Sequence, residues 1–175
     1  MLSAKGYRQW WGEYEILGLR PGQTAPESLK ALARNSSQVV ASTRKRSIET
    51  AELVCEGRAY ATDDALIEAP LPQLPLPDWL RLPPVAWGFL SRFAWYWFNH
   101  HGAEESRREA ERRAAGMAGR LAEMASGGDV LVLAHGFFNA MIAQALRRRH
   151  WKLTDDGGYR YFPQYWAARR FENGD

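Results

Sequence analysis

Two short apolar segments, each followed at once by a segment with helical spacing, constrain the fold of this chain more than any other feature. Residues 38–41 read Gln-Val-Val-Ala, and residues 129–134 read Asp-Val-Leu-Val-Leu-Ala. Continuous apolar strands of this kind are typical of a parallel sheet that helices cover on both faces. Ligands in such sheets bind at the carboxyl ends of the strands. The sequence therefore predicts an α/β fold with a ligand site where these two strands end.

Apolar residues at three- and four-residue spacing predict the helices of the chain. We expect helices over residues 3–17, 26–34 and 137–149, and another that starts within the polar run 42–52. In the helix at 26–34, Leu29, Leu32 and Ala33 are expected to face inward. A long helix over residues 104–125 carries a core-facing stripe made of Ala110, Ala114, Met117, Leu121 and Met124.

The length of 175 residues fits one domain, so we expect a single domain over residues 1–175. Residues 69–101, which are proline-rich and then aromatic, are expected to form an insertion over the site. Their aromatic part, residues 87–98, contains Arg92 and is too short to span a bilayer. It is expected to be a helix packed over the sheet or the surface of a homodimer, with a membrane-surface anchor as the alternative.

Composition and charge limit the expected binding partners and the expected cellular compartment. The net charge is +3, and the one basic cluster, at residues 147–152, is expected to be a solvated helix end, so nucleic acid is not an expected partner. Cys55 is the single cysteine and is expected to be a small buried hydrophobe. The N-terminal residues do not resemble a signal peptide, so we expect a cytoplasmic protein. No metal site and no cofactor are predicted.

Polar and basic residues follow each of the two strands. After the first strand come Ser42, Arg44 and Arg46, where a new helix is expected to begin and its free N–H groups favour a phosphate. A solvated basic loop explains the same residues equally well. After the second strand come His135 and Gly136. A histidine there can donate a hydrogen bond to a bound oxyanion, although a lone histidine in such a turn is more often structural than catalytic.

Together, the two motifs resemble those of the histidine phosphatase (phosphoglycerate mutase-like) superfamily. Ser42, Arg46 and the run Thr50-Ala51-Glu52 are similar to its second-arginine motif, and His135-Gly136 to its second-histidine motif. The resemblance extends to residues 2–6, to Glu68, and to Gly102, Glu105 and Ser106 ahead of the long helix. It implies a three-layer α/β/α fold with a mostly parallel sheet, from which the first strand is missing.

The resemblance also implies a role for each site residue. Arg46 would bind phosphoryl oxygens, His135 would stabilise the charged transition state, and Glu68 would give a proton to the leaving group. Ser42 would add a hydroxyl or backbone contact, and Arg44 would support the site at most. The implied activity is phosphomonoester hydrolysis through a phosphohistidine, on a phosphorylated small molecule or a phosphoprotein.

One departure from the family is expected to abolish this activity in the chain as written. Family members begin with a strand that ends in Arg-His-Gly and supplies the attacking histidine, and these 175 residues contain no such segment. His100 and His101 do not follow an apolar strand and are poor substitutes. Two hypotheses follow: a hydrolase whose sequence is N-terminally truncated, or a pseudophosphatase that binds a phosphate ligand or a protein. Without the first strand, residues 38–41 should pair directly with residues 130–133, or a second copy should cover the gap.

Overall fold

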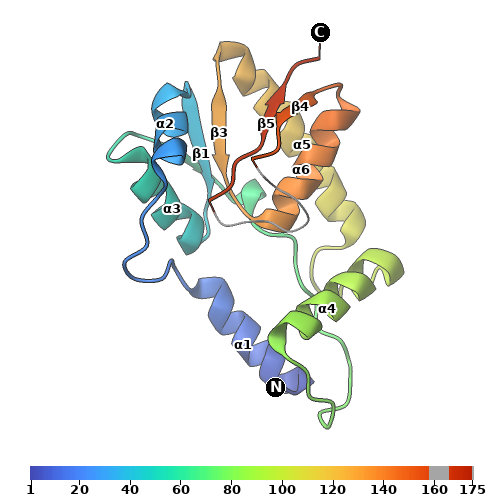
Figure 1. The fold of residues 1–175 in the computed structure, drawn as a ribbon. Helices are drawn as coiled ribbons and strands as arrows, with labels where there is room; N and C mark the ends of the chain where they lie inside the picture. The colour runs from blue at the N-terminus through green and yellow to red at the C-terminus, as the bar shows by residue number, and fades with distance from the viewer. Residues whose placement is uncertain (158–165, 175) are drawn as a thin grey trace. The chain divides into compact units, whose positions relative to one another are not determined.

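The computed structural model describes residues 1–157 and 166–174, which group into two compact units (Figure 1). One unit comprises Met1–Leu17 and Ala69–Arg112, and the other comprises Gly18–Glu68 and Arg113–Asp175. Both motifs that follow an apolar strand lie in the second unit. The single domain over 1–175 and the insertion at 69–101 stay predictions.

The second unit is built on a parallel sheet of three strands. These are β1 (Gln38–Ser42), β2 (Ala61–Asp63) and β3 (Val130–Leu133), in the order β2-β1-β3. The two strands that the sequence predicts, β1 and β3, therefore lie side by side. Their register pairs Gln38 with Val130 and Ala41 with Leu133, which is the direct pairing expected of a sheet without a first strand. A separate antiparallel pair consists of β4 (Lys152–Asp155) and β5 (Arg170–Glu172).

Helices cover this sheet on both faces, as the apolar character of β1 requires. Figure 1 shows α2 (Glu27–Asn35) and α3 (Lys45–Cys55) on one side, with α6 (Gly136–Arg148) and α5 (Arg107–Met124) on the other. Two short 3-10 helices, η1 (Asp64–Leu66) and η2 (Ala125–Gly127), precede Glu68 and β3 respectively. The predicted α/β fold is confirmed.

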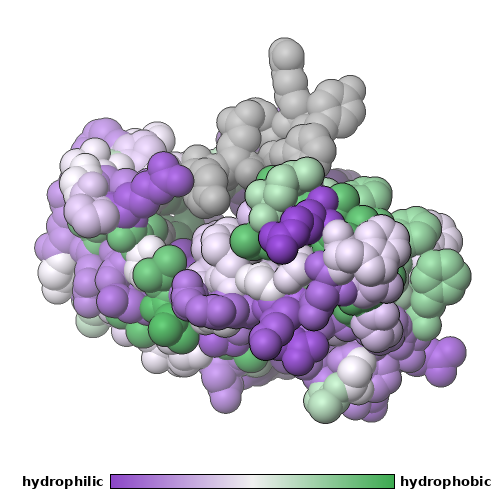
Figure 2. All heavy atoms as spheres, turned by 90° about the horizontal axis from the view of Figure 1, so that it is seen from below, coloured by the Kyte–Doolittle hydropathy of each residue, from purple (hydrophilic) through white to green (hydrophobic). Residues whose placement is uncertain are grey.

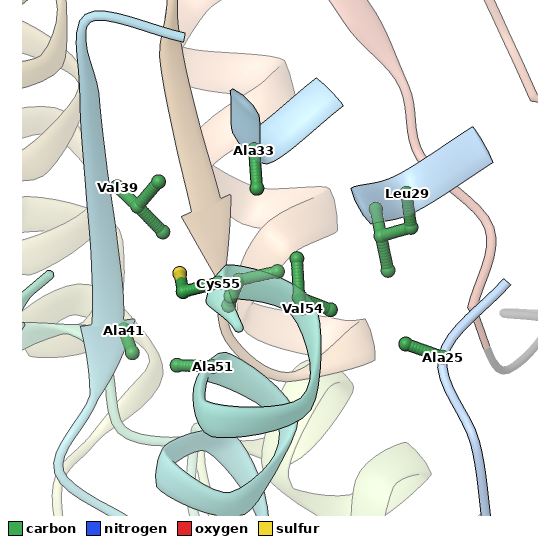
Figure 3. Packing of buried hydrophobic residues seen from close by; sticks show 9 residues of the cluster. Ala25, Leu29, Ala33, Val39, Ala41, Ala51, Val54 and Cys55 are labelled. Carbon is green, nitrogen blue, oxygen red and sulfur yellow. The ribbon is translucent and has the colours of Figure 1, made fainter. Parts of the chain in front are cut away.

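The core on the α2–α3 side follows from the two-residue alternation of a strand. Val39 and Ala41 of β1 point toward α3, where Ala51, Val54 and Cys55 meet them (Figure 3). Cys55 is buried as predicted, and burial raises the pKa of its thiol. From α2, Leu29 and Ala33 complete the cluster. The inward position predicted for Leu32 is wrong, because this side chain lies beside the buried pair and is 37% exposed.

The opposite side of the sheet is lined by α6 and by residues 113–124 of α5, which belong to the same unit as the sheet. The predicted stripe of α5 is confirmed at four positions, which are almost fully buried: Ala110, Ala114, Met117 and Leu121. Met124 at the end of the stripe is only partly buried. From α6, Phe138 and Ile142 are also almost fully buried. This packing fixes the first turn of α6, which begins directly after His135.

The first unit contains α1 (Ala4–Ile16), α4 (Pro84–Phe98), the residues 69–83 and 99–106 on either side of α4, and the start of α5 up to Arg112. Ser3 is the N-cap of α1, and its hydroxyl accepts the N–H of Gly6 at 3.2 Å. The buried Trp87 of α4 lies with its ring centroid 5.9 Å from that of Tyr7. Its indole N–H donates to the carbonyl of Leu2 at 2.8 Å. Aromatic side chains therefore hold these two helices together.

The other side of α4 is aromatic and exposed. Phe89, Phe93 and Trp97 follow one another at four-residue spacing and are 70%, 44% and 68% exposed. Figure 2 shows hydrophobic side chains exposed among hydrophilic ones on one face of the molecule. Among the described residues, no helix combines the length and the apolar character that crossing a membrane requires.

Candidate functional site

The backbone brings both motifs to the same edge of the sheet. Because β1 and β3 are adjacent and parallel, their carboxyl ends lie at one edge. Arg44 is the N-cap of α3, and His135 is the N-cap of α6. Each helix therefore opens at this edge with backbone N–H groups that have no partner within the helix and a partial positive charge.

His135 is held in this edge by hydroxyl groups from the first motif. Its side chain is buried, and Nε2 lies 3.0 Å from the hydroxyl oxygen of Ser42. The hydroxyl of Ser47 lies 3.5 Å from the same nitrogen, at the limit of a hydrogen bond. Ser42 also accepts the backbone N–H of Arg44 at 3.4 Å. The hydroxyl of Ser42 is thus free to donate its own proton to Nε2 of a neutral imidazole.

Burial and positive charge keep this imidazole neutral. Burial is the largest cause that lowers the pKa of His135 to about 4, and the charges of Arg46, Arg44 and Arg113 act in the same direction. The half-buried guanidinium groups of Arg46 and Arg44 belong to the first motif, and Arg113 comes from α5. A site with this excess of positive charge favours an anion.

The lowered pKa of His135 predicts that the folded state becomes less stable as the solution is acidified. Between pH 6.5 and 4 the unfolded chain protonates this histidine and the folded chain does not, so the stabilisation is complete above pH 6.5 and is lost as pH falls to 4. The shift corresponds to about 3 kcal/mol. In urea unfolding between pH 6.5 and pH 4, the free energy of unfolding should therefore decrease by about 3 kcal/mol more for the wild type than for the variant His135→Gln. Equal losses in the two proteins would contradict the burial of a neutral His135.

Glu68 lies at the start of α6. One carboxylate oxygen accepts the N–H of Phe138 at 2.8 Å, and the other accepts the N–H of Phe137 at 3.2 Å. These are the second and third residues of α6, so Glu68 satisfies two of the orphan donors of this helix. The carboxylate is therefore bound to residues that follow His135 by two and three positions in the chain. Its role as a proton donor stays a prediction.

Arg113 is a site neighbour that sequence reasoning missed. Its Nη1 donates to the carbonyls of Ala65 and Ile67 at 2.8 and 2.9 Å, just before Glu68. Its guanidinium carbon lies 3.8 Å from the centroid of the Phe138 ring. In the sequence, Arg113 follows Arg112 in a highly charged helix. Only its place directly before Ala114 of the buried stripe distinguishes it from a solvated cation.

The two histidines considered as substitutes for a nucleophile belong to the first unit. His100 Nε2 lies 2.8 Å from the carbonyl oxygen of Gln73, and His101 Nδ1 lies 3.1 Å from that of Glu104. Each ring therefore has one nitrogen bonded to the backbone of its own unit. Within residues 1–157 and 166–174, no group of three or more His, Cys, Asp or Glu side chains could hold a metal ion.

A comparison with protein families shows which family this chain belongs to. Residues 16–157 match the model of the histidine phosphatase superfamily (branch 1). The chain belongs to this superfamily. Membership of the histidine phosphatase superfamily supports a phosphatase-like function and agrees with the parallel sheet and the helices that cover it.

Other comparisons with known proteins add little to this assignment. Among curated proteins, none matches this histidine phosphatase superfamily member. A solved structure from an open reading frame of Mycobacterium tuberculosis is similar at 17% sequence identity and a TM-score of 0.49. The alignment covers 93% of this chain and 89% of that one. The assignment to the superfamily rests on the match over residues 16–157 alone.

Proposed function

We propose that this chain binds the phosphoryl group of a phosphomonoester through Arg46, His135 and Ser42, as part of a histidine phosphatase. One observation carries the proposal: the imidazole of His135 is buried against Ser42 at an edge that three guanidinium groups make positive. A phosphate dianion would offset this positive charge and supply the oxygens that the polar groups there can bind. The ligand classes that fit are a phosphorylated small molecule and a phosphoprotein.

Each residue has a defined part in the proposed reaction. A histidine nitrogen attacks phosphorus while the bond to the leaving oxygen breaks, and water then hydrolyses the phosphohistidine. Arg46 would hold the equatorial oxygens, whose charge is spread in the transition state. His135 would take up a proton as the dianion binds and then donate a hydrogen bond to it.

The proton for the leaving group is assigned to Glu68. This assignment asks Glu68 to carry a proton, whereas both of its oxygens accept N–H groups of α6 in the structure. Donation therefore requires that one of these two hydrogen bonds weakens as the substrate binds. The same bonds give Glu68 a structural role that is independent of catalysis.

The attacking histidine is the part that the 175 residues do not supply in the expected form. No Arg-His-Gly follows an apolar strand in this sequence, and His135 is engaged with Ser42. We therefore propose that the chain as written binds phosphate but does not hydrolyse phosphomonoesters. Because Glu68 has a structural role as well, its presence does not distinguish a hydrolase from a pseudophosphatase that binds a phosphate ligand or a protein.

Calorimetric titration with orthovanadate and with inorganic phosphate tests the proposed binding. We expect saturable binding of one anion per chain and competition between the two anions. Assay of the same protein with an aryl phosphate should show negligible hydrolysis. A chain that binds neither anion would refute the proposed function, and hydrolysis that disappears in His101→Ala would show that the nucleophile has been wrongly excluded.

We also propose a second copy of the chain as the partner of α4. Phe89, Phe93 and Trp97 form one exposed aromatic row, and such a row on each copy can be buried by the other in a symmetric dimer. Size-exclusion chromatography with light scattering should give a dimer mass, and the double variant Phe89→Ser/Phe93→Ser should give a monomer. A wild-type monomer at high protein concentration would rule the dimer out.

The compartment is also a proposal. The single cysteine of the sequence, Cys55, is buried in the core, and no disulfide framework contributes to the described fold. A reducing compartment suits such a protein, so we propose a cytoplasmic location.

A further inference from the structure

We propose that Arg113 is a positioning residue that fixes the carboxylate of Glu68 and the first turn of α6 beside His135. This inference rests on the proposed function, because it assigns Arg113 to the phosphate site. Two sets of contacts and one electrostatic effect support this role of Arg113, all within the second unit of the chain.

The first set connects Arg113 to the segment that carries Glu68. Nη1 donates one N–H to the carbonyl of Ala65 and the other to the carbonyl of Ile67, at 2.8 and 2.9 Å. Between these carbonyls lies Leu66, whose side chain is fully buried. The segment is therefore fixed on its apolar side by Leu66 and on its polar side by Arg113, immediately before Glu68.

The second set connects Arg113 to the residue that binds Glu68. The guanidinium carbon lies 3.8 Å from the ring centroid of Phe138, within the range of a cation–π interaction. The backbone N–H of Phe138 donates to Glu68 at 2.8 Å. Arg113 thus contacts both the segment before Glu68 and the residue that holds its carboxylate. The planar guanidinium is needed because it stacks on a ring while its edge donates to two carbonyls.

The third observation is electrostatic. The positive charge of Arg113 acts on His135, together with those of Arg46 and Arg44. The buried Ala114 and Met117 hold α5 in place, so this charge is carried by a fixed element. Arg113 therefore contributes both shape and charge to the site without being assigned a contact with the substrate.

Two substitutions separate the shape from the charge. Arg113→Met keeps much of the length and removes the charge, whereas Arg113→Lys keeps the charge and removes the planar fork. Arg112→Met is the matched control, because Arg112 is exposed on the same helix. NMR spectroscopy of the full chain would follow the amide signals of Phe137 and Phe138 and the titration of His135, and calorimetry would measure orthovanadate binding.

We expect the amide signals of Phe137 and Phe138 to move in both Arg113 variants and to stay unchanged in Arg112→Met. Arg113→Met should also raise the pKa of His135 and weaken orthovanadate binding roughly tenfold, the effect of losing one nearby cation. Arg113→Lys should leave the pKa of His135 low. If Arg113→Met does not fold, the amide signals of Arg113→Lys decide the matter.

Unchanged amide signals in a folded Arg113→Lys or Arg113→Met protein would overturn the inference. A purely structural role would lower stability without moving the titration of His135, and an unmoved titration in folded Arg113→Met would therefore also overturn it. The amide and histidine readouts do not depend on anion binding. Failure of the wild type to bind orthovanadate would consequently refute the proposed function while leaving the positioning of Glu68 to be judged on its own evidence.

Discussion

A strand that ends in Arg-His-Gly, joined to the N-terminus of this chain through a flexible linker, is expected to raise hydrolysis of an aryl phosphate by at least about 10⁴-fold. The increase reflects the covalent step that an attacking histidine makes available, and loss of such a nucleophile in other enzymes costs a factor of this size or more. Among the described residues β3 pairs only with β1, so an added strand can pair with its other edge. Parallel pairing there would bring the new histidine to the same edge as His135.

The matched control is the same added strand with alanine in place of its histidine. This control should fold and bind orthovanadate like the active form and should hydrolyse no more substrate than the chain alone. If the alanine control is as active as the histidine form, the rate gain does not come from a phosphohistidine. If neither form gains activity although the added strand is shown to pair with β3, the assignment of the remaining site to phosphate chemistry is contradicted.

Arg46→Ala is expected to weaken orthovanadate binding by about tenfold to a hundredfold, because charge-assisted hydrogen bonds to an anion are worth roughly 1.5–3 kcal/mol. Among the charges acting on His135, that of Arg46 has the largest effect. Removing it should therefore weaken the anion site and raise the pKa of His135. Calorimetric titration of the variant measures the affinity directly.

Arg44→Ala provides the comparison for this prediction. Arg44 is the N-cap residue of α3, and its charge has a smaller effect on His135 than that of Arg46. We expect a loss of affinity in Arg44→Ala that is several times smaller. A larger loss of affinity in Arg44→Ala than in Arg46→Ala would show that Arg44, and not Arg46, makes the phosphoryl contact.

The elements that the sequence predicts well are those with a strong apolar pattern. β1 and β3 are continuous apolar runs, and α5 carries an unbroken stripe, so each was predicted within a few residues of its observed bounds. β2 and the pair β4 and β5 were not predicted. Ala61–Asp63 is short and largely exposed. β4 and β5 are short as well, and each contains a single large apolar residue, Leu153 or Phe171, among polar ones.

The site residues were predicted from two motifs, but their contacts were not. His135 with Ser42 joins residues 93 positions apart, and only the adjacency of β1 and β3 brings them together. The capping of α6 by Glu68 and the bonds from Arg113 to Ala65 and Ile67 use backbone groups of distant segments. Backbone donors and acceptors carry no sequence signal, because every residue except proline has the same pair. Such contacts become visible only when the fold is known.

The most direct test of the account is an NMR titration of His135 with and without saturating inorganic phosphate. The site described here predicts that the pKa of His135 is about 4 in the free protein. It also predicts that bound phosphate raises this pKa toward neutrality, because the dianion offsets the charges of Arg46, Arg44 and Arg113. A histidine whose ring signals and pKa do not change when phosphate saturates the protein would contradict the claim that His135 holds the phosphoryl group.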